Sequence, residues 1–174
     1  MKIFLVGFMG AGKTTIGKRI AELLQFPFID LDEAITTELG ESISSCFETK
    51  GEFFFRQKES YCLKNITEKN IVIATGGGTL CDDGNLSYMN ENGLIVYLNC
   101  SEESLFKRLS AIPNNRPLLK NILPENLKKY ISETLRERKK YYEKSDVIFN
   151  EISNDVNQNA TAIITEIKPL IYGK

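Results

Sequence analysis

The chain has 174 residues, most simply one domain, which buries about 70% of its unfolded surface without disulfides or metals. Its 22 basic and 23 acidic residues give a formal charge of −1, which provides no broad electrostatic reason to bind nucleic acid or a membrane. There is no histidine, so catalytic schemes that depend on imidazole are excluded. We expect a monomer with a small-molecule partner and catalysis by carboxylates, lysine, arginine or a metal.

The cysteines and the N-terminus bear on the cellular compartment. The apolar run from Ile3 to Met9 is too short for a secretion signal and leads into Gly-Lys-Thr rather than a cleavage site. No stretch approaches the roughly 18 apolar residues of a membrane span, so we expect a cytoplasmic protein. The cysteines form no C-x-x-C pair and indicate neither a zinc site nor a redox motif, so we interpret them as reduced core residues: Cys46, Cys62, Cys81 and Cys100.

The first predicted strand, loop and helix carry the strongest signal in the chain. The strand is a short apolar run from Ile3 to Val6, as in a buried parallel strand, and the later helix has one apolar face with Ile16, Ile20, Leu23 and Leu24. Between them, Gly7 to Thr14 matches G-x-x-x-x-G-K-[ST] at every position, which chance would produce less than about once in a hundred such chains. The alternative is a glycine-rich connecting turn, which has no need of Lys followed by Thr.

The residue types of this loop explain how it would hold phosphate groups. Glycine lets successive backbone N–H groups turn inward around an anion, and the start of the helix adds the positive end of its dipole. The Lys13 ammonium can bridge the outer phosphates, and the Thr14 hydroxyl suits a magnesium ion. We therefore predict a nucleotide phosphate site formed by Gly10, Ala11, Gly12, Lys13, Thr14 and Thr15.

Further along the chain, apolar runs alternate with segments of helical periodicity. The runs at 28–31, 71–74, 94–98 and 147–149 predict four more strands. Helix starts are expected at Ser101, Pro124 and Asn154 or Asp155. The pattern indicates an α/β fold with five strands and about as many helices, in one domain over residues 1–174.

Two aspartates stand at the end of the second predicted strand. Alternation along a strand would put the carboxylates of Asp30 and Asp32 on the same side. Ligands of open α/β sheets collect at the carboxyl ends of the strands, so we expect this pair near the phosphate loop if the two strands are close together. The alternative is that Asp32 caps a helix over residues 33–39.

Two arginines lie on helical faces that are otherwise apolar. Glu59 shares such a face with Phe55, and Arg56 lies one turn before Glu59, where an i, i+3 ion pair would hold it. A surface salt bridge is the alternative. Arg138 interrupts a similar apolar stripe in a later helix. Because an arginine on a buried face requires an anion, we predict that Arg56 and Arg138 hold a small carboxylate.

Two segments without regular structure complete the predicted site. The third strand leads into Gly76, Gly77 and Gly78, which would permit the close approach of a ligand, although a flexible strand exit is the alternative. Residues 111–123 are rich in proline and asparagine and have the length of a lid. We expect this segment to close over the substrates and to bring Arg116 to the transferring phosphoryl group, an ordinary surface loop being the alternative.

In this order, the pieces closely resemble the shikimate kinase family. The resemblance spans residue 3 to about residue 149 and rests on the phosphate loop, Phe28 to Asp32, Gly51-Glu52, Phe55-Arg56, Glu59, Thr75 to Gly78, Arg116 to Leu119, Arg138 and Tyr142. It implies a three-layer P-loop kinase fold with a five-stranded parallel sheet flanked by helices, a substrate-binding segment at about 32–60 and a lid at about 111–123. The implied activity is ATP-dependent phosphorylation of the shikimate 3-hydroxyl, giving 3-phosphoshikimate on the route to aromatic amino acids.

The resemblance also implies residue roles, with Lys13, Asp32 and Arg116 as the catalytic set. Lys13 and Arg116 would contact phosphates, and Mg²⁺ would be held by Thr14 and, through water, by Asp30. The residues implied for shikimate are Asp32, Arg56, Gly77 and Arg138. The chain departs from the family near residues 150–155, where an adenine-contacting loop is expected but no arginine occurs.

Three other functions share parts of this pattern. A kinase for gluconate or a nucleoside monophosphate would share the phosphate loop, but it would not obviously explain Asp32, Arg56 and Arg138 together. A GTPase-type switch usually carries Asn-Lys-x-Asp and Asp-x-x-Gly segments, which are absent here. A catalytically inactive nucleotide-binding module is disfavoured by the intact Lys13, Thr14 and Asp32.

Overall fold

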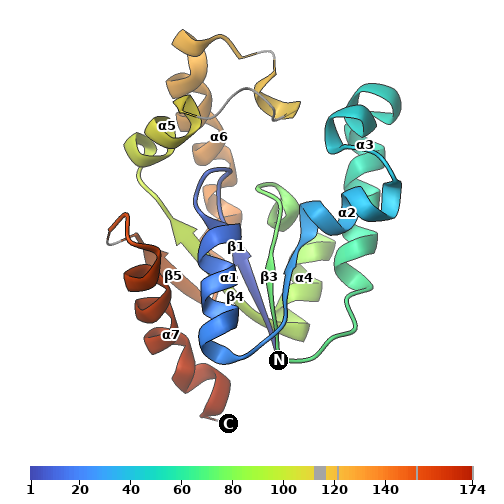
Figure 1. Ribbon diagram of the computed structural model, residues 1–174. Coiled ribbons are helices and arrows are strands. Elements are labelled where there is room, and N and C mark those ends of the chain that lie inside the picture. Colours follow the sequence, from blue (N-terminus) through green and yellow to red (C-terminus); the bar gives the residue numbers. More distant parts are fainter. Residues whose placement is uncertain (112–116, 121, 152, 174) are drawn as a thin grey trace.

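The computed structural model describes residues 1–111, 117–120, 122–151 and 153–173, which form a three-layer α/β fold (Figure 1). The parallel sheet consists of β1 (Lys2–Val6), β2 (Phe28–Asp30), β3 (Ile71–Ala74), β4 (Gly93–Asn99) and β5 (Val147–Asn150). The α-helices are α1 (Lys13–Leu24), α2 (Leu31–Leu39), α3 (Ile43–Lys64), α4 (Asp83–Asn92), α5 (Glu102–Ser110), α6 (Leu127–Tyr142) and α7 (Val156–Tyr172). Short 3₁₀ turns occur at Thr79–Cys81, Pro117–Leu119 and Pro124–Asn126. The predicted five-stranded sheet flanked by helices is confirmed.

The strand order is β2-β3-β1-β4-β5, so β3 lies between β1 and β2. Because every pairing in the sheet is parallel, the strands end at one edge, which is the upper edge in Figure 1. The chain segments that follow β1, β2 and β3 therefore leave the sheet side by side, while both chain termini lie at the opposite end (Figure 1). This arrangement places the predicted functional segments at the edge where open α/β sheets bind ligands.

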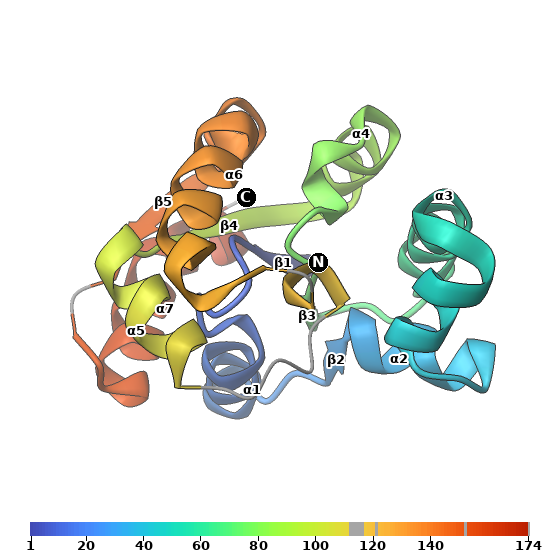
Figure 2. The ribbon, with the colours of Figure 1, turned by 90° about the horizontal axis from the view of Figure 1, so that it is seen from above.

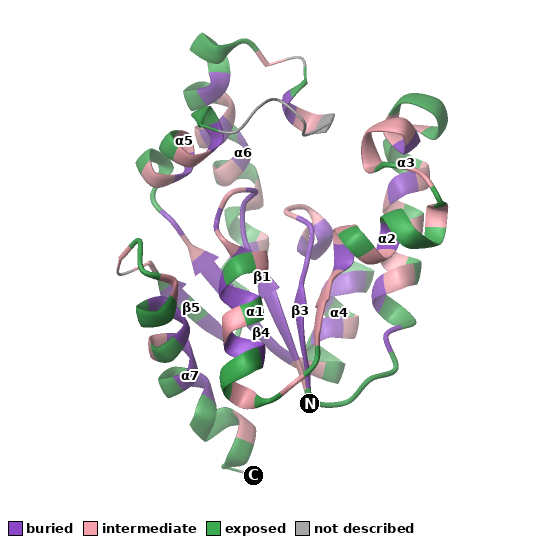
Figure 3. Cartoon of the chain, in the orientation of Figure 1, coloured by how far each residue is buried: buried purple, intermediate pink, exposed green. Residues whose placement is uncertain are grey.

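The side chains of β1 divide the core between the two faces of the sheet. Ile3 and Leu5 pack in one apolar cluster with residues of α1 and α7, whereas Phe4 and Val6 pack in a second cluster with residues of α3 and α4. Seen from above, α1 and α7 lie on one face and α4 and α6 on the other (Figure 2). The three inner strands β1, β3 and β4 are buried on both faces, as expected for a parallel sheet, whereas the edge strand β2 is half-buried and the edge strand β5 exposes Ile148 and Asn150. The helices expose one side each (Figure 3).

The start of α2 corrects two predictions. β2 ends at Asp30 and the helix begins at Leu31, so Asp32 lies in the first helical turn and strand alternation does not place it. The residue that caps the helix is Asp30, not Asp32: its Oδ1 accepts hydrogen bonds from the backbone N–H groups of Asp32 and Glu33 at 3.0 and 3.4 Å. An aspartate at the N-cap satisfies helix donors that have no partner within the helix.

The interpretation of the cysteines as core residues is confirmed for two of the four. All four cysteines are free thiols, with Cys46 and Cys100 buried in the core and the other two half-buried. Burial raises the pKa of the Cys100 thiol to about 11, so this group stays protonated at neutral pH. Among the described residues, no helix is both long enough and apolar enough to cross a bilayer.

Gly93 provides a test of the β1–β4 pairing. A Cβ at this position would lie 2.2 Å from the backbone oxygen of Lys2 and 2.8 Å from the Phe4 ring, although the backbone conformation itself is an ordinary extended one. Gly93→Ala should therefore lower the free energy of unfolding by roughly 1 to 3 kcal/mol in urea denaturation, because neither neighbour can move freely. Gly84→Ala is the control, since its nearest neighbours are the ends of two side chains and alanine favours the helix. Equal unfolding midpoints for the two variants would contradict this account.

Candidate active site

Two cavities open at the carboxyl edge of the sheet. The first has a volume of about 420 Å³ and the second about 650 Å³. Met9, Asp32 and Gly77 line both of them, so the two cavities share a wall. Two ligands could therefore be held with their reacting groups next to each other.

The second cavity contains the phosphate loop. It is lined by Gly10, Gly12, Lys13, Thr14 and Thr15. The loop backbone has positive φ angles at Gly10 and Gly12, of 83° and 88°, which residues with a Cβ rarely adopt. Ala11 behaves differently, because its methyl group is buried in the core and its N–H donates to the Phe8 oxygen at 3.1 Å.

Polar side chains converge at the start of α1. The Lys13 ammonium is buried and donates to the backbone oxygens of Gly7 and Phe8 at 2.8 and 3.0 Å. The Thr14 hydroxyl donates to Asp30 Oδ2 at 2.6 Å. The predicted closeness of the aspartates to the loop is therefore confirmed, even though β3 separates the two strands. The Lys13 cation, the Thr14 hydroxyl and the Asp30 carboxylate therefore lie together at the N-terminus of α1, which is the positive end of the helix dipole.

The second cavity also has polar residues that the sequence reasoning missed. Arg108 of α5 donates to the Gly10 oxygen at 3.2 Å, to the Glu151 carboxylate, and to Asn154 Oδ1 at 3.4 Å. All three side chains line the cavity. A signal was present, because Arg108 lies between the buried Leu105 and Leu109 on the inner face of its helix. The same signal identified Arg138.

The first cavity holds Arg56 in a network with two carboxylates. Arg56 Nη1 donates to Glu59 Oε2 at 2.8 Å, and Nη2 donates to Glu52 Oε1 at 3.0 Å. Glu59 is only 1% exposed and also accepts the Thr79 hydroxyl at 2.5 Å. Burial alone would lower the pKa of Arg56, but the charge and hydrogen bonds of Glu59 and Glu52 outweigh it and raise the pKa. The predicted i, i+3 pair is confirmed, and burial of Glu59 excludes the surface alternative.

Arg138, on α6, lines the same cavity, but its surroundings differ from those of Arg56. Its Nη1 donates to the Gly77 oxygen at 2.9 Å, and its guanidinium lies 5.9 Å from the centroid of the Phe8 ring. Among the described residues, no carboxylate lies within ion-pair distance of Arg138. An arginine that faces a cavity without a carboxylate partner is suited to a bound anion.

The rest of the first cavity combines an apolar wall with hydroxyl and carboxylate side chains. Most of its lining comes from α2 and α3, and the apolar members include Ile43, Phe47, Phe55 and Leu118. Phe47 and Phe55 pack together with ring centroids 4.8 Å apart. Asp32 stands at the wall shared with the phosphate loop. A small ring with one anionic group and several hydroxyls fits such a lining.

Part of the predicted lid, residues 117–120, 122 and 123, lies among the residues that the structure describes. Leu118 and Leu119 are half-buried and buried, and Leu118 lines the first cavity. Arg116 lies outside the described residues, so its predicted contact with the phosphates stays a prediction.

A phosphate loop that shares a wall with a second cavity lined by two arginines is the arrangement expected of a P-loop kinase with a small-molecule acceptor. The family model for shikimate kinase matches residues 9–168. The chain belongs to the shikimate kinase family.

Named relatives support this membership. A shikimate kinase of Parabacteroides distasonis is 41% identical over 150 residues, which cover 86% of this chain and 87% of the relative. The crystal structure of a shikimate kinase from Bacteroides thetaiotaomicron has a TM-score of 0.89 and 35% identity, covering 97% of this chain and 98% of the other. The shikimate kinase of Acinetobacter baumannii, solved in complex with shikimate, has a TM-score of 0.91 and 33% identity, covering 98% and 94% of the two chains.

The two carboxylates that hold Arg56 should contribute very unequally to stability. Glu59→Ala removes the partner of a half-buried guanidinium and of the Thr79 hydroxyl, so it should lower the free energy of unfolding by roughly 2 to 4 kcal/mol. Glu52→Ala removes the partly exposed partner of the same arginine, with an expected effect of about 0 to 1 kcal/mol. Urea denaturation of both variants measures the difference. Similar midpoints would show that the burial of Glu59 does not increase its contribution to the free energy of unfolding.

Proposed function

We propose that the chain transfers the terminal phosphoryl group of ATP to the 3-hydroxyl of shikimate. The hydroxyl oxygen forms the new bond to phosphorus, the bond between that phosphorus and the bridging oxygen breaks, and ADP and 3-phosphoshikimate leave. The observation that carries the proposal is the wall of Met9, Asp32 and Gly77, which the phosphate-loop cavity shares with the arginine-containing cavity. Holding both reactants at such a wall supplies the proximity on which phosphoryl transfer depends.

The second cavity is proposed to hold ATP with its phosphates at the loop. Backbone N–H groups of the loop and the Lys13 ammonium would stabilise the charge that develops on the transferring group. The nucleoside end would lie toward Arg108, Glu151 and Asn154, which are fixed to one another by hydrogen bonds. Arg108, Glu151 and Asn154 would take the place of the arginine that the family resemblance leads us to expect near residues 150–155 and that this chain lacks there.

Thr14 and Asp30 are proposed to hold Mg²⁺ together with the phosphates. The pair fits this ion, because the Thr14 hydroxyl can supply an oxygen ligand and the Asp30 carboxylate, whose Oδ2 lies 2.6 Å from that hydroxyl, can reach the ion through water. Among the described residues, no group of three or more acidic, cysteine or histidine side chains could hold a metal, which agrees with an ion bound mainly by phosphates and water. When bound, Mg²⁺ supplies neutralisation of the phosphate charge.

The first cavity is proposed to hold shikimate. Arg138 and Arg56 would bind the carboxylate, while Phe47 and Phe55 would pack against the ring. Asp32 would accept a hydrogen bond from the attacking hydroxyl, orient it and take its proton. We further propose that the chain acts as a monomer in the cytoplasm, where free thiols stay reduced.

A coupled assay of ADP release tests the function. Turnover should require shikimate as acceptor, with gluconate and nucleoside monophosphates inactive, and it should stop when a chelator removes Mg²⁺. Lys13→Ala should lower turnover by at least about 100-fold, because it removes a cation that acts in the transition state. A preference for another acceptor would refute the substrate, and Lys13→Ala turnover within about threefold of the wild type would refute the kinase mechanism.

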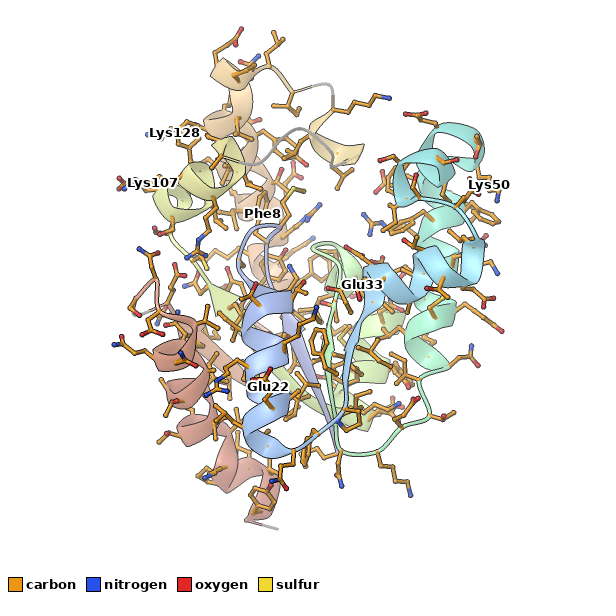
Figure 4. All side chains as sticks on the ribbon, viewed as in Figure 1. Phe8, Glu22, Glu33, Lys50, Lys107 and Lys128 are labelled. Carbon is orange, nitrogen blue, oxygen red and sulfur yellow. The ribbon has the colours of Figure 1, made fainter. Side chains whose placement is uncertain are left out.

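The carboxylate site predicts a specific loss in Arg138→Ala. Removing this cation should weaken shikimate binding by roughly 2 to 5 kcal/mol, since a desolvated carboxylate would lose its fork-shaped partner. Lys128→Ala is the control, because Lys128 lies on the same helix and is exposed on the outer side of the molecule (Figure 4). Isothermal titration with shikimate measures both variants. If an analogue without the carboxylate bound wild-type protein as tightly as shikimate, the arginines would not be a carboxylate site.

A further inference from the structure

The last residue of α6 is a buried phenol that lies behind both cavities. Tyr142 is only 1% exposed, and its ring stacks on Tyr97 of β4 with centroids 4.7 Å apart and planes inclined by 20°. Its hydroxyl donates to the backbone oxygen of Gly77 at 2.5 Å. Burial raises the pKa of Tyr142, although the neighbouring Arg138 cation works against this, so the phenol stays protonated and donates.

The Gly77 oxygen accepts two hydrogen bonds from the same helix, one from Tyr142 and one from Arg138 Nη1 at 2.9 Å. The peptide bond is planar and trans, so fixing this C=O also fixes the N–H of Gly78, which points away from α6. Gly77 and Gly78 both line the first cavity. Without such an anchor, a peptide between two glycines has several orientations of similar energy.

The surroundings of this peptide link it to both halves of the site. A Cβ on Gly77 would lie 3.3 Å from Arg138 Nη1 and also 3.3 Å from the Met9 amide nitrogen. A Cβ on Gly78 would lie 2.9 Å from Arg56 Nη2. The peptide therefore stands between the phosphate loop and the two arginines, and its orientation affects how Arg138 is presented to the cavity.

We propose that Tyr142 is a positioning residue for the acceptor: its hydroxyl anchors the Gly77–Gly78 peptide, which keeps Arg138 and the Gly78 amide aligned toward the acceptor's carboxylate and hydroxyl groups. Tyr142 does not line either cavity and acts through Gly77 and Arg138. The role of this peptide toward shikimate rests on the proposed function, whereas the anchoring itself does not.

Tyr142→Phe tests the proposal, because it removes the hydroxyl and keeps the stacked ring. Tyr97→Phe is the matched control: it removes a hydroxyl from the other ring of the same stack, which donates to Asn99 Oδ1 at 3.0 Å rather than to Gly77. We expect the shikimate Kd of Tyr142→Phe to rise about 5- to 10-fold, which corresponds to the loss of one buried hydrogen bond. Tyr97→Phe should stay within twofold, and both variants should bind a non-hydrolysable ATP analogue within twofold of the wild type.

A second measurement does not depend on the substrate. In ¹⁵N-labelled protein without ligands, the Gly78 amide resonance should shift in Tyr142→Phe and stay in place in Tyr97→Phe. An unchanged shikimate Kd and an unchanged Gly78 resonance in Tyr142→Phe would overturn the inference. Parallel weakening of shikimate and nucleotide with a matching fall in Tm would also overturn it, since that result indicates a purely structural role. If wild-type protein failed to bind shikimate, the proposed function would fail, and the Gly78 resonance would still decide the anchoring.

Discussion

The site depends on the absence of side chains where β3 ends. A Cβ at Gly76 would lie 2.5 Å from Glu59 Oε1, a Cβ at Gly77 would lie 3.3 Å from Arg138 Nη1, and a Cβ at Gly78 would lie 2.9 Å from Arg56 Nη2. None of the three has a positive φ angle, so it is space and not backbone conformation that requires glycine here. Because the strand leaves this space, α3 and α6 can bring charged groups up to the phosphate loop from opposite sides. The sequence predicted a close approach by a ligand, and in the structure the groups that approach are the protein's own.

The two arginines of the first cavity are not equivalent. Arg56 is held by Glu59 and Glu52, so its charge is largely compensated before any ligand binds. A buried carboxylate such as Glu59 loses much of its hydration, so the folded state is stable only while Arg56 remains paired with it. Arg138 has a backbone oxygen and the Phe8 ring as neighbours, which orient the guanidinium without neutralising it. In the proposed carboxylate site, Arg56 would therefore contribute fixed geometry, while Arg138 would contribute most of the net attraction for an anion.

Periodicity explains what the sequence could predict and what it could not. The apolar runs predicted all five strands because a parallel sheet is buried on both faces. Glu59 and Arg138 were found because a polar residue on an apolar helical face stands out. Asp32 was assigned to the wrong element, since the boundary between β2 and α2 depends on which aspartate caps the helix. The pairing of Arg108 with Glu151 joins residues 43 positions apart, and local pattern carries no information about such a contact. Strand order is equally non-local, so the insertion of β3 between β1 and β2 could not be predicted from the pattern.

The kink in α3 shows how one residue lets a single segment line the cavity from two directions. Gly51 has φ 82° and ψ 169° inside the helix, and apart from its chain neighbours and the adjacent helix backbone no described atom lies within 4 Å of a Cβ built there. Glycine is required at this position for conformation and not for space, the reverse of the requirement at the end of β3. The residues before the kink contribute Ile43 and Phe47 to the cavity, and those after it contribute Arg56 and Glu59. An unbroken helix has one direction and one inner face, so the apolar wall and the charged network could not both turn toward the cavity.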